Sequence, residues 1–295
     1  MALPSAGSSI SLQQVNVELG NTGTDAINMG SSAVRTLFDD ASGAISMSDG
    51  FGKSSELGLT ASAASSANLK TLFDNATSGS WAGSTAKRFT IGASTTMGII
   101  TAPASMGGTL IIDLAGNIQG VAGTANGGAG ATAMTIQSAN ITINMASGST
   151  ISGGGGGGGQ GGTGGQGKYT TCQNDNNCGG TGIGSCNQDE DVICQYVTSG
   201  GAGGAGGRGQ GYSQALANGS SGAGGGTQAG AGGAGGNGAA FGAAGAAGSA
   251  GANGNHSSGS AGSGGGAAGR AITFSGLSAY TIIDTDSGTI NGAYT

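Results

Sequence analysis

The chain has 295 residues, of which 70 are glycine and two are proline; 7% are charged, 4% are aromatic, and the net charge is −6. An ordinary protein contains about 7% glycine, so glycine is about threefold enriched here. Phosphate backbones are bound by clustered Lys and Arg, which this chain lacks, so nucleic acid and anionic membrane surfaces are excluded as expected partners. The low charge and scarce proline also differ from typical disordered chains. The composition indicates a structural protein whose backbones pack directly on one another.

The opening, MALPSAGSSISLQQ, has neither the basic nor the apolar part of a secretory signal. No apolar run approaches the ~18 residues of a spanning helix, and the most apolar stretch, 97–116, is interrupted by Pro103 and Asp113. We therefore expect a protein without membrane insertion that is assembled in the cytoplasm and released by lysis.

Residues 1–57 predict a small helical module. Ser11 and Gln14 have the spacing of a capping box, which predicts a helix over 12–19. A second helix is predicted over 29–38, and a single further turn follows it. A module of this size buries little surface, so we expect it to attach to a partner; a poorly ordered N-terminus is the alternative.

Residues 58–87 are rich in Ala and Ser and are expected to form a linker or packing segment, with a short helix at 69–75. Residues 88–152 predict strands, because apolar and β-branched residues partly alternate there between Gly, Asn and Ser. Together with 271–295 they are expected to form a β platform.

An internal repeat supports that platform. Two β residues, Asp or Asn, a glycine-bearing turn and Ile-x-Gly occur at 111–120, 141–153 and 282–292. Because the third copy follows the glycine-rich region, that region is predicted to be an insertion in the platform. The expected core residues are Ile112, Leu114, Ile118, Ile136, Ile141, Ile143, Ile151, Ile272, Phe274, Leu277, Ile282 and Ile290.

Glycine recurs every third residue within 153–270, for example at 153, 156, 159, 162 and 165, and again from 242 to 254. A period of three is that of polyproline II. Collagen does not fit, because the region contains no proline and its tracks are short. A solvated Gly/Ser linker without ordered structure is the alternative. We expect a mainly β protein plus polyglycine II: a helical N-terminal module, a β platform and a bundle of packed glycine helices.

The breaks between glycine tracks are predicted to be loops. They include 168–199, 211–221 and 253–258, and the aromatic residues of the region lie in or beside them. Polar and aromatic loops on a rigid support commonly bind surfaces or glycans. The candidate receptor-binding residues are Tyr169, Asp175, Asn176, Tyr196, Tyr212, Phe241, Asn255 and His256.

All four cysteines, Cys172, Cys178, Cys186 and Cys194, lie within the first loop with the spacing C-x5-C-x7-C-x7-C. Zinc ligands usually come in close C-x2–4-C pairs, so two disulfides are favoured over a zinc site or free thiols. Of three possible pairings, we favour Cys172 with Cys178 and Cys186 with Cys194. Such bonds form only in an oxidising medium.

The same loop contains four acidic residues, which leaves a Ca²⁺ site open, although a solvated acidic loop is favoured. No other cofactor is expected. The single histidine, His256, has no acid nearby, and the glycine runs lack the lysine of a phosphate-binding loop. We therefore expect that the protein is not an enzyme.

The opening, MALPSAGSSISLQQVNVELG, with AINMGSSAVRTLF and SGAISMSDGFGKS, closely resembles the N-terminal module of many tailed-phage tail and virion structural proteins. TINMASGSTISGGGGGG and GGAAGRAITFSG resemble the same group. The glycine body is similar to the receptor-binding domain of T-even-type tail-fibre adhesins, in which packed polyglycine II helices carry variable loops. The resemblance implies an attachment module at the N-terminus and a receptor-binding tip in the glycine body.

The first functional hypothesis is therefore a phage tail-fibre or tail-tip adhesin that binds a host glycan or outer-membrane protein non-covalently. Its expected location is the distal tail of the virion, where residues 1–57 contact other tail or fibre proteins; a homo-oligomer is left open. A virion fibre without receptor binding is the second hypothesis. A host surface matrix protein and a glycan-degrading enzyme are weaker alternatives.

Overall fold

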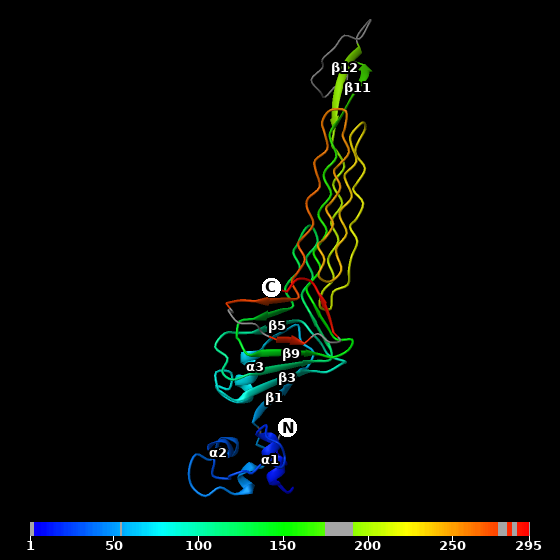
Figure 1. Cartoon of the computed structure of the whole chain (residues 1–295). Coiled ribbons are helices and arrows are strands. Elements are labelled where there is room, and N and C mark those ends of the chain that lie inside the picture. Colours follow the sequence, from blue (N-terminus) through cyan, green and yellow to red (C-terminus); the bar gives the residue numbers. More distant parts are fainter. Residues whose placement is uncertain (1–2, 54, 175–190, 277–281, 285–287, 295) are drawn as a thin grey trace.

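The computed structural model describes residues 3–53, 55–174, 191–276, 282–284 and 288–294. Three parts follow one another: a helical module, a platform of strands and a long bundle that ends in a two-stranded ribbon (Figure 1). Strands outnumber helices in the described chain, so the fold is mainly β. Among those residues, no helix combines the length and the apolar character needed to cross a membrane.

The N-terminal module contains the predicted capping box. Helix α1 spans Leu12–Glu18, and the Ser11 hydroxyl accepts a hydrogen bond from the Gln14 N–H at 3.2 Å. In return, the Gln14 side chain accepts the Ser11 N–H at 2.7 Å. Helix α2 spans Ser32–Phe38 and so begins three residues later than predicted. Its start is displaced because Ser31 is the residue that caps it, at 3.4 Å from the Val34 N–H.

A 3₁₀ turn, η1, spans Met47–Gly50 and completes this module. Five buried side chains form its core, which is separate from the core of the platform: Leu3, Val15, Val34, Leu37 and Phe38.

The platform consists of three sheets in which every strand pair is parallel. The first sheet contains β1 (Glu56–Thr60), β3 (Ala86–Ile91), β6 (Leu110–Leu114), β9 (Ile141–Met145) and β14 (Ile282–Asp284). The second contains β2 (Ser66–Asn68), β5 (Ile99–Ala102), β8 (Met134–Ile136) and β13 (Ile272–Phe274). The third contains β4 (Thr96–Met97), β7 (Asn117–Gln119), β10 (Thr150–Ser152) and β15 (Thr289–Asn291).

The chain visits these sheets in rotation, which is the architecture of a parallel β-helix. Equivalent residues of successive coils stack, as in the column Phe89, Ile112 and Ile143. Most of the predicted core is confirmed, because eight of its twelve residues are buried: Ile112, Leu114, Ile118, Ile136, Ile141, Ile143, Ile151 and Ile272. Phe274 and Ile290 pack against that core while partly buried. Leu277 and the Ile282 side chain lie outside the described part.

Residues 58–87 belong to the β-helix instead of forming a free linker, since they include β2 and parts of β1 and β3. Helix α3 spans Leu69–Ala76, and Leu69, Phe73 and Trp81 are fully buried in the main core. Lys87 is also fully buried, and its ammonium donates to the carbonyls of residues 83, 85 and 107 at 2.8–2.9 Å. Burial lowers the pKa of Lys87, because the charged form is desolvated.

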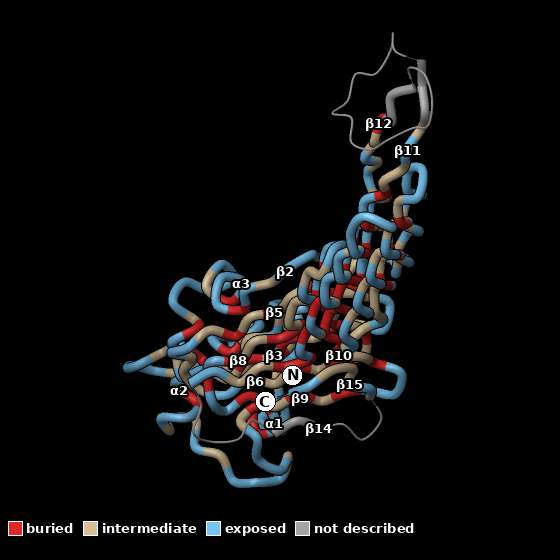
Figure 2. The backbone as a smooth tube through the Cα atoms, turned by 90° about the horizontal axis from the view of Figure 1, so that it is seen from above, coloured by how far each residue is buried: buried red, intermediate tan, exposed pale blue. Residues whose placement is uncertain are grey.

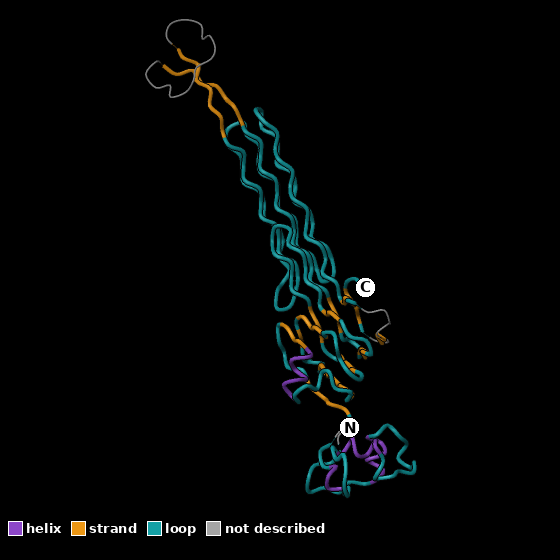
Figure 3. The backbone as a smooth tube through the Cα atoms, turned by 90° about the vertical axis from the view of Figure 1, so that its left-hand side faces the viewer, coloured by secondary structure: helices purple, strands orange, loops and turns teal. Residues whose placement is uncertain are grey.

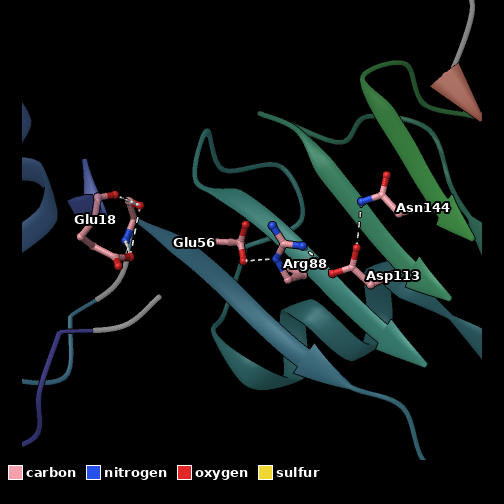
Figure 4. A network of polar contacts seen from close by, with 6 residues as sticks. Glu18, Glu56, Arg88, Asp113 and Asn144 are labelled. Carbon is pink, nitrogen blue, oxygen red and sulfur yellow. Dashed lines mark hydrogen bonds and ion pairs between the residues drawn. The ribbon is translucent and has the colours of Figure 1, made fainter. Parts of the chain in front are cut away.

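Ion pairs cross the outer face of the first sheet (Figure 4). The Arg88 guanidinium contacts Glu56 at 2.6 Å and also Asp113. Asp113 in turn accepts a hydrogen bond from the Asn144 amide at 2.9 Å. The hydrogen bonds to Glu56 and Asp113 raise the pKa of Arg88. The network links β1, β3, β6 and β9.

The glycine region is inserted within one coil of the β-helix. It leaves from β10 and returns at β13, at the corner between the third and second sheets. In the preceding coil, the same corner is the connection between β7 and β8, and residues 120–131 of that connection contact the base of the bundle. The bundle is therefore an enlarged corner of the β-helix.

Figure 3 shows the bundle as long extended loops beyond the strands, and Figure 2 shows buried backbone where it meets them. The hydrogen bonds define six extended segments and place the first, residues 153–166, at the centre. Every third N–H from Gly155 to Gly164 donates to segment 200–210 at 2.8–2.9 Å. Every third N–H from Gly156 to Gly165 donates to segment 243–254 at 2.8–2.9 Å. The central carbonyls accept from 229–242 and 257–269 with the same period. The sixth segment, 217–223, donates to segment 200–210.

The run of seven glycines coincides with the fully enclosed part of the central segment. A Cβ on Gly154 would lie 1.9 Å from the Val121 carbonyl oxygen, and one on Gly157 would lie 1.8 Å from that of Thr124. Farther along the central segment, where residues 120–131 no longer cover it, the three-residue series that begins with Gly154 and Gly157 continues with side chains that are exposed: Gln160, Thr163 and Gln166. The glycine run therefore ends where that side of the segment opens to solvent.

Gly158→Ala should lower the stability of the protein by about 2–3 kcal/mol. The reason is that its Cβ would lie 2.0 Å from the Gly236 carbonyl oxygen, so two hydrogen-bonded segments would have to separate. Gly264→Ala is the matched control in the same bundle, since a Cβ there meets nothing within 4 Å; its effect should stay within about 0.5 kcal/mol. Chemical denaturation would measure both, and equal effects would contradict the packing.

Candidate functional site

The end of the bundle farthest from the platform carries a ribbon of two antiparallel strands (Figures 1 and 3). Strand β11 (Gly167–Asn174) continues directly from the central segment, and β12 (Asp191–Thr198) leads into segment 200–210. The register places Gly167 opposite Thr198. Two turns of the bundle, 224–228 and 254–257, lie at the foot of this ribbon. We define the distal tip as the ribbon together with these two turns.

Two predicted binding residues meet on the ribbon. Tyr169 and Tyr196 are cross-strand partners, and their rings stack with centroids 5.5 Å apart and planes inclined by 22°. Both are half-buried, whereas Val197 beside them is 55% exposed. A rigid aromatic pair offers contact area at a low entropy cost. His256 is exposed, and Asn255 lies beside it in the turn at the ribbon's foot.

Two other predicted binding residues lie at the opposite end of the bundle. The Tyr212 N–H donates to the Gly120 carbonyl at 3.0 Å, which places Tyr212 beside the platform. Phe241 precedes Gly242, whose N–H donates to the Gly153 carbonyl at 2.8 Å. Antiparallel segments turn alternately at both ends of the bundle, so half of their loops face the platform. Tyr212 and Phe241 therefore do not form one site with Tyr169 and Tyr196.

Asp175, Asn176, Cys178 and Cys186 lie outside the described residues, and so does the Cys172 side chain. Cys194 is buried and takes part in a disulfide bond; the favoured pairing stays a prediction. The acidic residues that left a Ca²⁺ site open also lie outside the described side chains. Within the described residues, no group of three or more His, Cys, Asp or Glu side chains could hold a metal ion.

A set of polar side chains that was not predicted from the sequence completes the backbone hydrogen bonding. The hydroxyls of Ser257, Ser260 and Ser263 accept the N–H groups of Gln166, Thr163 and Gln160 at 2.7–2.8 Å. These serines recur every third residue, which is the signal that could have identified them. Four asparagine side chains accept bundle or ribbon N–H groups in the same way: Asn126, Asn237, Asn253 and Asn255.

A cavity of about 390 Å³ lies beside β1, β2 and α3. Its lining includes Leu59, Phe89 and Met97 and contains no titratable side chain. It belongs to the first coils of the β-helix and has no part in the distal tip.

No protein-family model matches the chain, and no curated protein matches it. Among solved structures, the chain is similar to the crystal structure of the gp37–gp38 adhesin tip complex of the bacteriophage S16 long tail fibre. The identity is 17% and the TM-score 0.40, with 90% of this chain and 92% of that chain covered.

Cys194→Ser should open the ribbon while leaving the bundle intact. An isolated two-stranded ribbon is marginally stable, and loss of a native disulfide typically costs 2–5 kcal/mol. Protease cleavage within 167–199 should accelerate by about tenfold or more, with an unchanged melting temperature of the bundle. Ser199→Ala is the control, and cleavage at the wild-type rate in Cys194→Ser would contradict a stapled ribbon.

Proposed function

We propose that this protein is a phage tail-fibre or tail-tip adhesin that binds the host cell surface through its distal tip. One observation carries the proposal: a hydrogen-bonded bundle holds an exposed ribbon with a stacked tyrosine pair at the end opposite the helical module (Figure 1). A rigid arm that ends in polar and aromatic residues suits contact with a surface distant from the body of the protein. Residues 200–269 contain one Lys, Arg, Asp or Glu side chain, that of Arg208, so the flanks of the arm provide little electrostatic attraction.

The remaining roles follow from this division of the molecule. Residues 1–57 attach the chain to other tail or fibre proteins, and the β-helix joins that module to the arm. The protein thus belongs to the distal part of the virion tail. Recognition is non-covalent and needs neither catalysis nor a cofactor, and the receptor is a glycan or an outer-membrane protein of the host.

We further propose that the bundle segments are polyglycine II helices. Their hydrogen bonds run between segments and recur every third residue, as a helix with three residues per turn requires. With a rise of about 3.1 Å per residue, the central segment would extend the arm by roughly 40 Å.

Chemical shifts of isotope-labelled protein test this conformation. Residues 156–165 should report φ near about −75° and ψ near about +145°. Shifts typical of α-helix, or of the more extended β region, would contradict polyglycine II.

The double variant Tyr169→Ala/Tyr196→Ala should lower the rate of virion adsorption to host cells by about tenfold or more, because central aromatic residues commonly dominate binding energy. Virion assembly should remain normal, since the ribbon lies outside the bundle and the platform. Adsorption is measured as the loss of free virions after mixing with host cells.

Tyr294→Ala is the matched control, because Tyr294 is 60% exposed and lies at the platform. It should adsorb like the wild type. Tyr212→Ala should also retain adsorption if the distal tip alone binds. Normal adsorption by the double variant would overturn the tip assignment and favour a virion fibre without receptor binding.

A further inference from the structure

Hydrogen bonds from the two turns of the bundle at 224–228 and 254–257 hold the foot of the ribbon. We infer that Asn255 and Gln228 are positioning residues, which fix the direction of the ribbon relative to the bundle. This inference rests on the proposed function, because a fixed direction matters only if the ribbon binds something. It assigns Asn255 a role different from direct contact with a receptor.

Asn255 clamps the first strand of the ribbon. Its side-chain oxygen accepts the Lys168 N–H at 2.7 Å, and its amide donates to the Lys168 carbonyl at 2.8 Å. The side chain thus pairs with both backbone groups of one residue, as a neighbouring strand would. Lys168 is the second residue of β11, so the clamp acts where the ribbon leaves the bundle.

Gln228 connects this clamp to the turn that holds the second strand. The Asn255 amide also donates to the Gln228 side-chain oxygen, and the Asn255 N–H donates to the Gln228 carbonyl at 3.2 Å. In the same turn, the Thr227 carbonyl accepts the Thr198 hydroxyl at 2.6 Å. The two turns and both strands therefore form one closed collar.

The backbone of Gln228 supports a role for its side chain. Its φ is +58°, a left-handed conformation that glycine adopts far more readily than glutamine. In a chain with 70 glycines, a glutamine at such a position is explained by the contact that its side chain makes. Among described residues β11 and β12 pair only with each other, so beyond the collar no further strand supports them.

Hydrogen exchange of the full-length protein tests the collar without any receptor. In Asn255→Ala, peptides covering 167–171 and 194–199 should exchange about tenfold faster, as expected when one or two hydrogen bonds are lost. Gln228→Gly should accelerate the same peptides, although glycine relieves the left-handed backbone. Peptides covering 155–165 should be unchanged in both variants. Virions with either variant should adsorb more slowly than the wild type.

Asn253→Ala is the matched control, since Asn253 lies two residues away and its side-chain oxygen accepts the Gly259 N–H of the bundle at 3.0 Å. It should leave ribbon exchange and adsorption as in the wild type. Unchanged ribbon exchange in both collar variants, or equal acceleration of 155–165, would overturn the inference. Faster ribbon exchange with normal adsorption would support the collar and contradict the proposed function.

Discussion

The hydrogen bond between neighbouring extended backbones is the interaction on which the bundle depends. It forms at every third residue of the central segment, toward a different neighbour for each of the three tracks. Such close approach is possible only where no Cβ intervenes, since a methyl group on most central glycines would lie near 2 Å from a carbonyl oxygen. The conformational entropy that glycine loses on folding is thus offset by backbone hydrogen bonds that no larger residue permits. The bundle therefore needs no hydrophobic core.

The β-helix gives this bundle its starting geometry. The glycine region leaves one coil of the β-helix at Gly153 and returns to it at Arg270. At these points β10 and β13 already pair with neighbouring strands of the β-helix. The apolar core lies in the β-helix and ends where the glycine run begins. One protein therefore uses two ways of stabilising a chain, side-chain burial in the platform and backbone bonding in the arm, and both meet at a single corner of the β-helix.

Much of this arrangement could be predicted from the sequence, because its causes are local or periodic. The capping box at Ser11, the alternation in β6 and β9 and the three-residue glycine period each act within a few residues. The parallel stacking of coils could not be predicted, since alternating strands fit several sheet topologies. The separation of Tyr212 from Tyr196 was also missed, because loop composition does not tell at which end of the bundle a segment turns. Asn255 was predicted from its loop as a receptor-binding residue, whereas its contact with Lys168 could not be predicted because it spans 87 positions of sequence.

The three-track pattern also restricts how such an arm can change length. Removing or adding one residue in the central segment would turn every later residue toward a different neighbouring segment. Gln160 and Thr163 would then face neighbouring backbones. A change of three residues would keep each residue facing the same neighbour, and with the rise of the proposed polyglycine II helix it would move the tip by about 9 Å. Antiparallel neighbours such as 200–210 would have to change by the same amount. In genetic terms, we expect viable length variants of this arm to differ by multiples of nine nucleotides in paired segments.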